Sequence, residues 1–222
     1  TKVLKETGEP YFGVSHISLA SVAADPQLVQ DISELLEIGK NKYAPLFGYQ
    51  TGIESGSVNL MRRHMAGKAL PFKTEQWPEV VEQAFGISKD YRWIPIATLV
   101  MGLPEETPDD LAANFELIDR LKDCPSFIIP QFFIPITETV LEKETMFSTS
   151  AMLDTHWQLI LKCMEHSTRW ADYLRSLYFS PESMFLRFGY WLGYRMLYFF
   201  AWVGGKQTCK RLGLKLKKPK AK

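Results

Sequence analysis

Four short apolar runs alternate with helix-like stretches through residues 11–134, and this alternation limits the folds open to the chain. The runs cover residues 11–20, 47–54, 93–101 and 126–134, and the last two are apolar almost throughout. Strands that are apolar on both faces are typical of parallel sheets covered by helices. We therefore expect an α/β fold of parallel βαβ units, which a doubly wound sheet or a piece of a barrel would both provide.

Helix signals stand between the apolar runs. Asp25 and Pro26 predict the N-cap and first turn of a helix over residues 27–38. Thr-Pro-Asp-Asp at 107–110 predicts a helix that ends near Lys122, with acids at the positive end of its dipole. Further helical segments are predicted from residue 57 onward and over 79–85, 151–177 and 184–203.

The three cysteines, Cys124, Cys163 and Cys209, are odd in number and far apart. They fit neither a disulfide framework nor a zinc site, so we expect a reducing, cytoplasmic compartment. No base is placed beside Cys124 or Cys163 by a local pattern. We interpret these two as small buried groups rather than nucleophiles.

The four histidines lack partners at metal-ligand spacing, so no metal site is expected among them. We interpret His16 as a strand residue that faces the packing and His64 as a helix-surface residue beside two arginines. His156 and His166 fall on a predicted helix.

A polar motif follows the second apolar run, at the carboxyl end where α/β proteins bind ligands. Its sequence is Gly-Ile-Glu-Ser-Gly-Ser at 52–57. Glu54 can accept hydrogen bonds from ribose hydroxyls or an ammonium group, and Gly56 permits close approach of the backbone. Ser57 can cap the next helix. The alternative is a plain strand-to-helix turn with no ligand.

A second motif ends the third run, with Gly102 just past the apolar residues and Glu105 and Glu106 just before a helix. Backbone groups at this strand end could pair with the edge of a flat heterocycle. The alternative is that the two acids only favour the helix N-terminus electrostatically.

Together with Phe-Phe-Ile-Pro-Ile-Thr-Glu-Thr at 132–139, these motifs resemble radical S-adenosylmethionine enzymes over residues 11–142. The most similar branch often carries a cobalamin-binding domain. The resemblance implies the C-terminal portion of a partial TIM-type (β/α)6 barrel, followed by C-terminal helices. The implied regions are the half-barrel over 1–146, a helical extension over 147–183, and an aromatic helix with a basic tail over 184–222.

The resemblance also implies a set of cofactor-binding residues. The strand that ends in Glu-Ser-Gly-Ser contacts the ribose and methionine parts of S-adenosylmethionine in such enzymes, and the end of the next strand contacts the adenine. Serines after the first strand lie near the methionine carboxylate, and a proline after the fourth lies beside the adenine. The implied positions are Ser18, Ser21, Glu54, Ser55, Ser57, Val100, Met101, Gly102, Glu105 and Pro135.

Several positions depart from the family pattern. Thr98 stands where the adenine motif Gly-x-Ile-x-Gly-x-x-Glu begins with glycine. Thr137 and Glu138 replace the second proline and the glycine of Pro-x-Pro-Gly-Thr, and alanines at 23–24 stand where an arginine is usual.

The Cys-x-x-x-Cys-x-x-Cys loop that binds a 4Fe-4S cluster does not occur in the sequence. The resemblance implies S-adenosylmethionine as cofactor, a 4Fe-4S cluster whose ligands are not in this chain, and a cobalamin bound by a domain also outside it. We expect the cluster loop upstream of Thr1 and no radical chemistry from this chain alone. The complete enzyme would form a 5'-deoxyadenosyl radical for hydrogen abstraction or methyl transfer on a small-molecule or lipid substrate.

The C-terminal region differs in composition from the rest. Residues 184–205 contain nine aromatic side chains, and residues 206–222 contain eight Lys or Arg and no acid, so a net charge of +1 hides a charge of −7 on residues 1–205. The longest uncharged run, 196–205, is too short to span a bilayer, which needs about 20 residues. We expect peripheral contact of 184–222 with an anionic cytoplasmic leaflet, and no nucleic-acid partner. The alternative is a helix that only covers the barrel.

A second hypothesis comes from a different functional class. The chain would be a non-catalytic, membrane-associated α/β module that binds a nucleotide-like ligand. A small hydrolase or transferase is disfavoured because neither Gly-x-Ser-x-Gly nor a phosphate-binding loop occurs.

Overall fold

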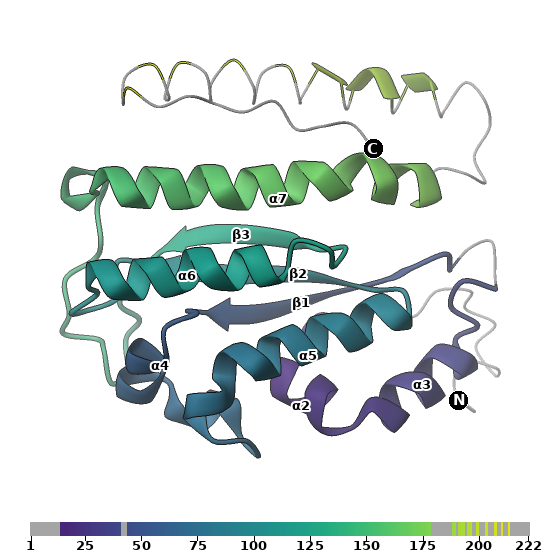
Figure 1. The fold of residues 1–222 in the computed structure, drawn as a ribbon, viewed down its shortest axis with the longest axis horizontal. Coiled ribbons are helices and arrows are strands. Elements are labelled where there is room, and N and C mark those ends of the chain that lie inside the picture. The colour runs from purple at the N-terminus through teal and green to yellow at the C-terminus, as the bar shows by residue number, and fades with distance from the viewer. Residues whose placement is uncertain are drawn as a thin grey trace. The chain divides into compact units, whose positions relative to one another are not determined.

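The computed structural model describes residues 14–40 and 44–178, and beyond them 188–189, 191–193, 195–196, 199, 203, 207, 210 and 213. The chain divides after Ser167 into two compact units. The first unit is an α/β structure built on a parallel sheet in the order β1-β2-β3 (Figure 1). Its strands are β1 (Phe47–Glu54), β2 (Trp93–Met101) and β3 (Phe127–Phe132).

The predicted strands at 47–54 and 93–101 are confirmed to the residue, and the strand predicted at 126–134 is shorter at both ends. The strand predicted over 11–20 is wrong in its second half. Within the described part of that run, His16 forms a single parallel bridge to Gln50, and a helix begins at Leu19. Leu19 and Ala20 look like a continued strand, but they are buried as the first turn of that helix.

Helices occupy the intervals between strands, as the sequence predicts. Asp25 caps the helix after it by accepting a hydrogen bond from the Leu28 N–H at 2.9 Å. The helix predicted at 79–85 extends further in both directions. The helices are α2 (Leu19–Ala24), α3 (Pro26–Leu35), α4 (Val58–His64), α5 (Trp77–Asp90), α6 (Pro108–Arg120) and α7 (Asp154–Tyr178), and the 3₁₀ turns are η1 (Ala66–Ala69), η2 (Thr74–Gln76) and η3 (Thr149–Ala151).

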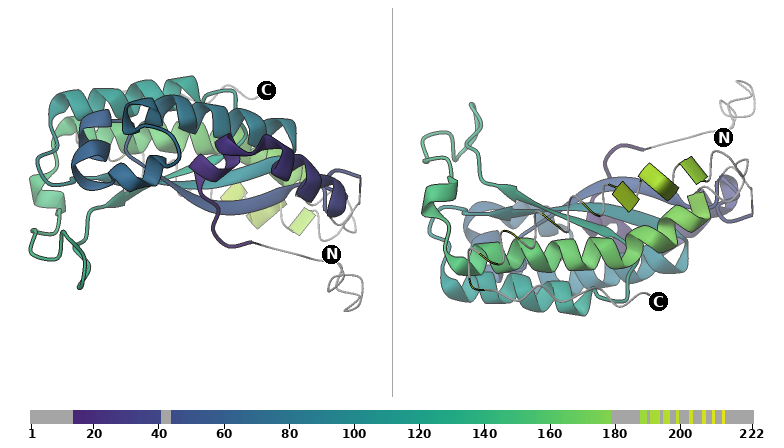
Figure 2. Two further views of the ribbon diagram at one scale, coloured as in Figure 1. Left: turned by 90° about the horizontal axis from the view of Figure 1, so that it is seen from below. Right: turned by 90° about the horizontal axis from the view of Figure 1, so that it is seen from above.

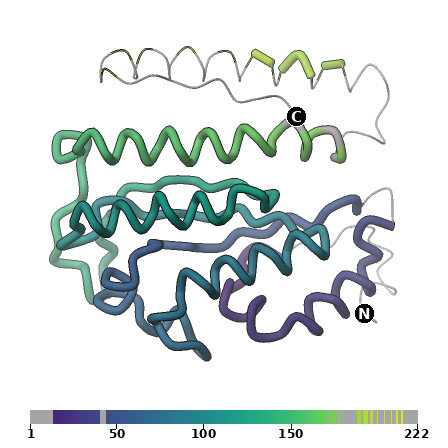
Figure 3. The backbone as a smooth tube through the Cα atoms, in the orientation of Figure 1, coloured from purple at the N-terminus to yellow at the C-terminus, as the bar shows by residue number. Residues whose placement is uncertain are grey.

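One face of the sheet carries the hydrophobic core, because side chains alternate between the two faces of each strand. Phe47, Tyr49 and Ile53 of β1 and Leu99 of β2 belong to one buried cluster with residues of α2, α3, α5, α6 and the start of α7. The helices therefore pack on the same face of the sheet. Figures 1 and 2 show α5 and α6 along that face, and Figure 3 shows the chain path.

Side chains on the opposite face are less covered. Gln50, Ile129 and Gln131 are exposed there, and Ile96 and Thr98 are half-buried. Burial therefore differs between the two faces. In both β1 and β2 every residue on the covered face is buried, whereas most residues on the opposite face are only partly buried or exposed.

The second unit begins at Thr168 within α7. In the helix predicted over 184–203, residues 188–189, 191–193, 195–196, 199 and 203 are helical, and the others lie outside the described residues. In the part of the chain that the structure describes, we find no helix with the length and apolar character that crossing a membrane requires.

Candidate functional site at the strand ends

The carboxyl ends of the parallel strands meet at one edge of the sheet, and most of the predicted site residues follow them. Glu54 ends β1 with a left-handed φ of 61°, and Gly102 follows β2 with a φ of 73°. A bulge between Gly52 and Glu54 shifts the pairing of β1 with β2. Bulges of this kind re-aim a side chain beside a site. The structure thus brings the two sequence motifs to neighbouring strand ends.

At the end of β1, the Glu54 carboxylate forms an ion pair with Lys68 of η1. The side chains of Lys68 and Glu54 are 30% and 19% exposed. The pair lies over Gly52, where an added Cβ would stand 2.0 Å from Glu54 Oε1 and 2.7 Å from Lys68 Nζ. Gly52 is therefore required for the carboxylate to fold back over the strand. Glu54 supplies an acceptor and Lys68 a donor at this edge.

The turn at 55–57 is fixed to α6 by Asn114. Asn114 Oδ1 accepts from the Gly56 N–H at 2.6 Å and from Ser55 Oγ at 3.3 Å. Its Nδ2 is buried and has no hydrogen-bond partner in the described part of the chain. Ser55 Oγ also accepts from the Ser57 N–H at 3.1 Å. A Cβ on Gly56 would stand 2.8 Å from the Ala113 carbonyl oxygen, so backbone meets backbone here. The turn is packed closely against α6.

Asp110 completes this attachment. Ser57 Oγ donates to its carboxylate, and the N–H and hydroxyl of Thr107 donate at 2.8 and 2.7 Å. Burial alone would raise the pKa of Asp110, but these hydrogen bonds together hold it below its ordinary value. Ser57 also caps α4 through the Leu60 N–H at 3.2 Å. The hydroxyls of Ser55 and Ser57 are therefore engaged inside the protein.

The end of β2 is arranged differently. A Cβ on Gly102 would stand 2.0 Å from Cγ of Phe147, so the phenyl ring fills the space that the glycine leaves open. The Gly102 N–H donates to Glu106 Oε2 at 3.0 Å. Phe147 comes from the long connection between β3 and α7, and its N–H donates to the Phe133 carbonyl at 3.0 Å.

Glu106 is paired with His156 of α7, and the two side chains are only 5% and 6% exposed. The Leu153 N–H donates to His156 Nδ1 at 3.0 Å, so Nδ1 carries no proton and Nε2–H donates to Glu106 Oε2 at 2.9 Å. Burial raises the pKa of Glu106 against the opposing hydrogen bonds from His156 and Gly102. Glu106 Oε1 is buried and has no hydrogen-bond partner among the described residues.

The remaining predicted positions are spread over different environments. Glu105 has a φ of 61°, points outward and pairs with Arg63 at 3.0 Å. Met101 is buried in the core, and Val100 is half-buried on the other face of β2. Ser18 and Ser21 are exposed at the start of α2, and Pro135 is half-buried beyond β3.

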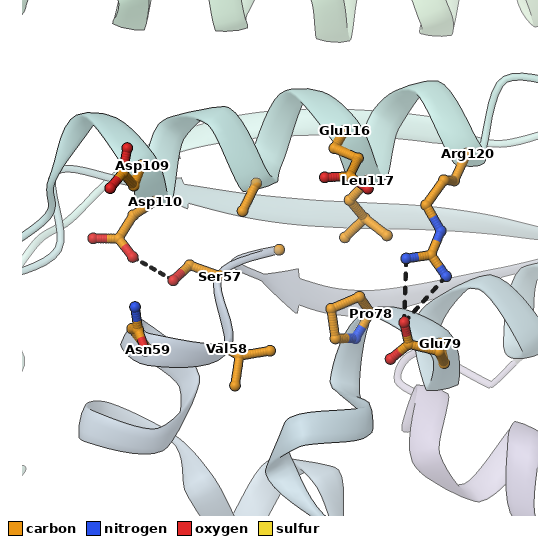
Figure 4. Close-up of a pocket in the computed structure, with 12 residues that line it drawn as sticks. Ser57, Val58, Asn59, Pro78, Glu79, Asp109, Asp110, Glu116, Leu117 and Arg120 are labelled. Atoms are coloured by element: carbon orange, nitrogen blue, oxygen red, sulfur yellow. Dashed lines mark hydrogen bonds and ion pairs between the residues drawn. The ribbon is translucent and has the colours of Figure 1, made fainter.

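A pocket of about 340 Å³ lies on the helix side of the turn, between α4, α5 and α6 (Figure 4). The Ser57–Asp110 hydrogen bond lies in its wall, and Arg120 pairs there with Glu79 at 3.3 Å. The polar groups in the wall of this pocket therefore bond to one another and connect neighbouring elements of the fold.

The structure describes His16, His64, Cys124 and Cys163, whereas Cys209 lies outside the described residues. His16 is exposed, so its predicted packing role is wrong, because the bridge it forms lies at the edge of the sheet. His64 Nε2 lies 3.0 Å from the Pro104 carbonyl and joins α4 to the β2 end. Cys163 is buried, as predicted, and Cys124 is half-buried. Burial raises the pKa of both thiols, that of Cys163 to about 12.

Ser126 and His166 form a buried serine–histidine pair, with Oγ and Nε2 2.8 Å apart. Ser126 Oγ donates its proton to the Cys124 carbonyl at 3.0 Å, so the histidine donates to the serine. This direction is opposite to that of a base activating a nucleophile. The pair joins α7 to the start of β3.

Sequence reasoning missed Lys68, Phe147 and His156, and gave Glu106 only an electrostatic role. Lys68 and His156 lie 14 and 50 residues from the acids they contact, so no local pattern connects them. A signal for Glu106 exists, since it stands four residues after a glycine that ends a strand.

Among the described residues, no group of three or more His, Cys, Asp or Glu could hold a metal ion. No family model matches the sequence, and no curated protein is significantly similar to it.

Proposed function

We propose that this chain is the C-terminal half of a radical S-adenosylmethionine enzyme and that the ends of β1 and β2 bind the cofactor. The order of the sheet supports a barrel segment over a doubly wound sheet. Each described strand pairs with the next one in sequence, and the helices pack on one face. A doubly wound sheet covers both faces and reverses its strand order at the ligand site. The less covered face would line the barrel interior.

The complete enzyme would cleave the bond between sulfur and C5' of S-adenosylmethionine with one electron, giving methionine and a 5'-deoxyadenosyl radical. That radical would abstract hydrogen from a small-molecule or lipid substrate, with methyl transfer through cobalamin as a further step. The cluster would supply the electron, and its cysteine ligands are not among these 222 residues. The part of this chain would be to bind and orient the cofactor.

The side chains at the strand ends match this cofactor in part. Glu54 and Lys68 offer an acceptor and a donor at the edge of the sheet, as ribose hydroxyls and the methionine zwitterion require. The missing side chain at Gly102 is the observation that carries the proposal, because it lets a flat ring, here that of Phe147, lie directly against the strand end. The hydroxyls of Ser55 and Ser57 do not match, since both are bonded to α6.

Calorimetric titration of the chain with S-adenosylmethionine tests the proposal. We expect Glu54→Ala to weaken binding by about tenfold or more, the effect of removing one charged hydrogen bond. Gly102→Val should weaken it as well, because the residue has a positive φ. Glu116→Ala on the exposed surface of α6 is the matched control. Full affinity in both site variants would contradict the proposed site.

Exposed apolar side chains in the second unit favour peripheral membrane contact. Their spacing of three or four residues is that of one helix face. Lys206 and the basic residues after it follow in sequence, which suits anionic headgroups. The same surface would also suit the second candidate function, a non-catalytic, membrane-associated module that binds a nucleotide-like ligand. The exposed residues are Phe188, Trp191, Leu192, Met196 and Phe199.

Co-sedimentation with liposomes tests the membrane contact. Removal of residues 184–222 should abolish binding to anionic vesicles, and zwitterionic vesicles should bind the intact chain weakly. Equal sedimentation of both forms would contradict the contact.

A Cys-x-x-x-Cys-x-x-Cys in the reading frame before Thr1 would favour the enzyme, and a start codon without it would favour the module.

A further inference from the structure

We infer that Phe147 occupies the place of a planar ligand at the end of β2, and that the connection carrying it must move away before such a ligand lies against Gly102. We call this connection, residues 133–153, the strap. The inference rests on the proposed function, since it concerns access to the same site.

The position of the ring is the first observation. The phenyl group of Phe147 lies within 2.4 Å of where a Gly102 Cβ would stand, at three of its ring carbons. The ring centroid is 5.9 Å from that of Phe132 and 5.0 Å from that of His156. A flat aromatic group therefore already fills the space at this strand end. A heterocycle of similar thickness would need the same space.

The strap packs on the rest of the fold through one small cluster, in which Phe133, Leu141 and Phe147 lie with Leu60 and Leu103. Residues 142–146 and 149–151 are exposed, whereas Phe147 is half-buried and bonded through its N–H to the Phe133 carbonyl. Segments with few buried contacts open locally at low free energy. Several apolar side chains of the strap also face solvent rather than the core. They are Ile134, Ile136, Val140, Met146 and Leu153.

A latch closes the strap at its C-terminal end. We use this name for Glu106 and His156, joined through Nε2–H to Oε2 at 2.9 Å. The Leu153 N–H donates to His156 Nδ1 at 3.0 Å. Through His156, the end of the strap and the start of α7 are both connected to the Glu106 carboxylate. The same oxygen accepts from the Gly102 N–H. Loss of the histidine would free this end of the strap, while the Gly102 N–H could still donate to Glu106 Oε2.

The unused oxygen of the latch indicates the chemistry of the ligand. Glu106 Oε1 is buried and lacks a partner among the described residues, which costs free energy in the closed form. An N–H donor on a planar heterocycle would satisfy it once Phe147 has left. The exocyclic amine of an adenine ring has this character, whereas a second phenyl ring does not.

Calorimetry with adenosine as probe tests the inference in the intact chain. Phe147→Ala should bind adenosine about tenfold tighter than the wild type, because a closed form lowers apparent affinity by the open fraction. His156→Ala should shift affinity in the same direction by a smaller factor. Met146→Ala, an exposed neighbour on the strap, should bind as the wild type does. Hydrogen exchange of residues 99–107 serves as a readout without ligand and should be faster in the first two variants.

Two results would overturn the inference, and they are distinguishable. If all four proteins bind adenosine equally, the site exists but Phe147 does not restrict it. If none binds adenosine or S-adenosylmethionine while exchange at 99–107 is faster in Phe147→Ala and His156→Ala, the strap opens but the proposed function is wrong. A circular dichroism melt of each variant confirms that the protein is folded.

Discussion

The ends of β1 and β2 lie side by side, but they are held by different kinds of contact. Behind β1, Gly56 lies against the backbone of α6 and the turn is bonded to Asn114. Behind β2, Gly102 lies against a side chain, Phe147. A backbone contact cannot be relieved by a rotamer change, whereas a ring can swing away. We conclude that the β1 turn is a fixed support and the β2 end is the part that can open.

The largest expected loss of stability comes from a substitution that removes the support of the β1 turn. Asn114→Ala leaves the buried Gly56 N–H without an acceptor and should lower the free energy of unfolding by about 3 kcal/mol. Urea unfolding measures this loss. Asn59→Ala, an exposed residue on α4, should change stability by less than about 0.5 kcal/mol. Equal stability of the two variants would mean that the turn does not depend on α6.

The next effect compares the two glycines in double-mutant cycles. Gly102→Ala should cost roughly 1–3 kcal/mol through its positive φ and its contact with Phe147. Phe147→Ala should recover part of this cost, giving a coupling of about 1 kcal/mol. Gly56→Ala should show no coupling to Phe147, since it meets the Ala113 carbonyl. Additive costs at Gly102 would show that the ring does not restrict it.

The two strand ends should also respond oppositely to pH. Because burial raises the pKa of Glu106 above 4.5, its contribution to stability is complete below that pH and is lost as pH rises through the raised pKa. The pKa of Asp110 lies below 3.8, so its contribution is present above that pH and is lost on acidification. Relative to the wild type, Glu106→Gln should therefore gain stability towards pH 8, and Asp110→Asn should gain it towards pH 3. Denaturant unfolding between pH 3 and pH 8 measures the stability of each variant relative to the wild type. The account would be contradicted if both variants gained stability in the same pH direction.

The smallest effect concerns the pair of Glu54 and Lys68. Because both side chains are partly exposed, Lys68→Met should lower the free energy of unfolding by less than about 1 kcal/mol. Lys73→Met, also exposed and nearby in sequence, is the control. A ligand-binding role predicts that Lys68→Met weakens S-adenosylmethionine binding more than it weakens the fold. Thermal unfolding and calorimetry on the same sample separate the two effects.

Much of the fold could be predicted from the sequence because its signals are local. The apolar runs at 47–54 and 93–101 have sharp ends, and Thr107 and Asp110 form a capping box that starts α6 as expected. The error at 11–20 arose where an apolar run passes from a strand segment into a buried helix. Periodicity cannot separate the two over so few residues.

The site could be predicted only in part. Glu54 and Gly102 were identified because their motifs end strands, and parallel strands bring their ends to one edge. The contacts that decide the site come from distant segments. Phe147 and His156 belong to a connection and a helix whose packing over β2 has no local signature, and Ser55 and Ser57 are bonded to α6 through Asn114 and Asp110.

Nuclear magnetic resonance of the intact chain during titration with S-adenosylmethionine tests the central claim most directly. We predict that the amide signal of Gly102 moves on binding, together with that of Phe147, while the signal of Gly56 stays in place. Unchanged signals at Gly102 and Phe147 at saturating ligand, or an equal shift at Gly56, would contradict the distinction between a fixed β1 turn and an opening β2 end.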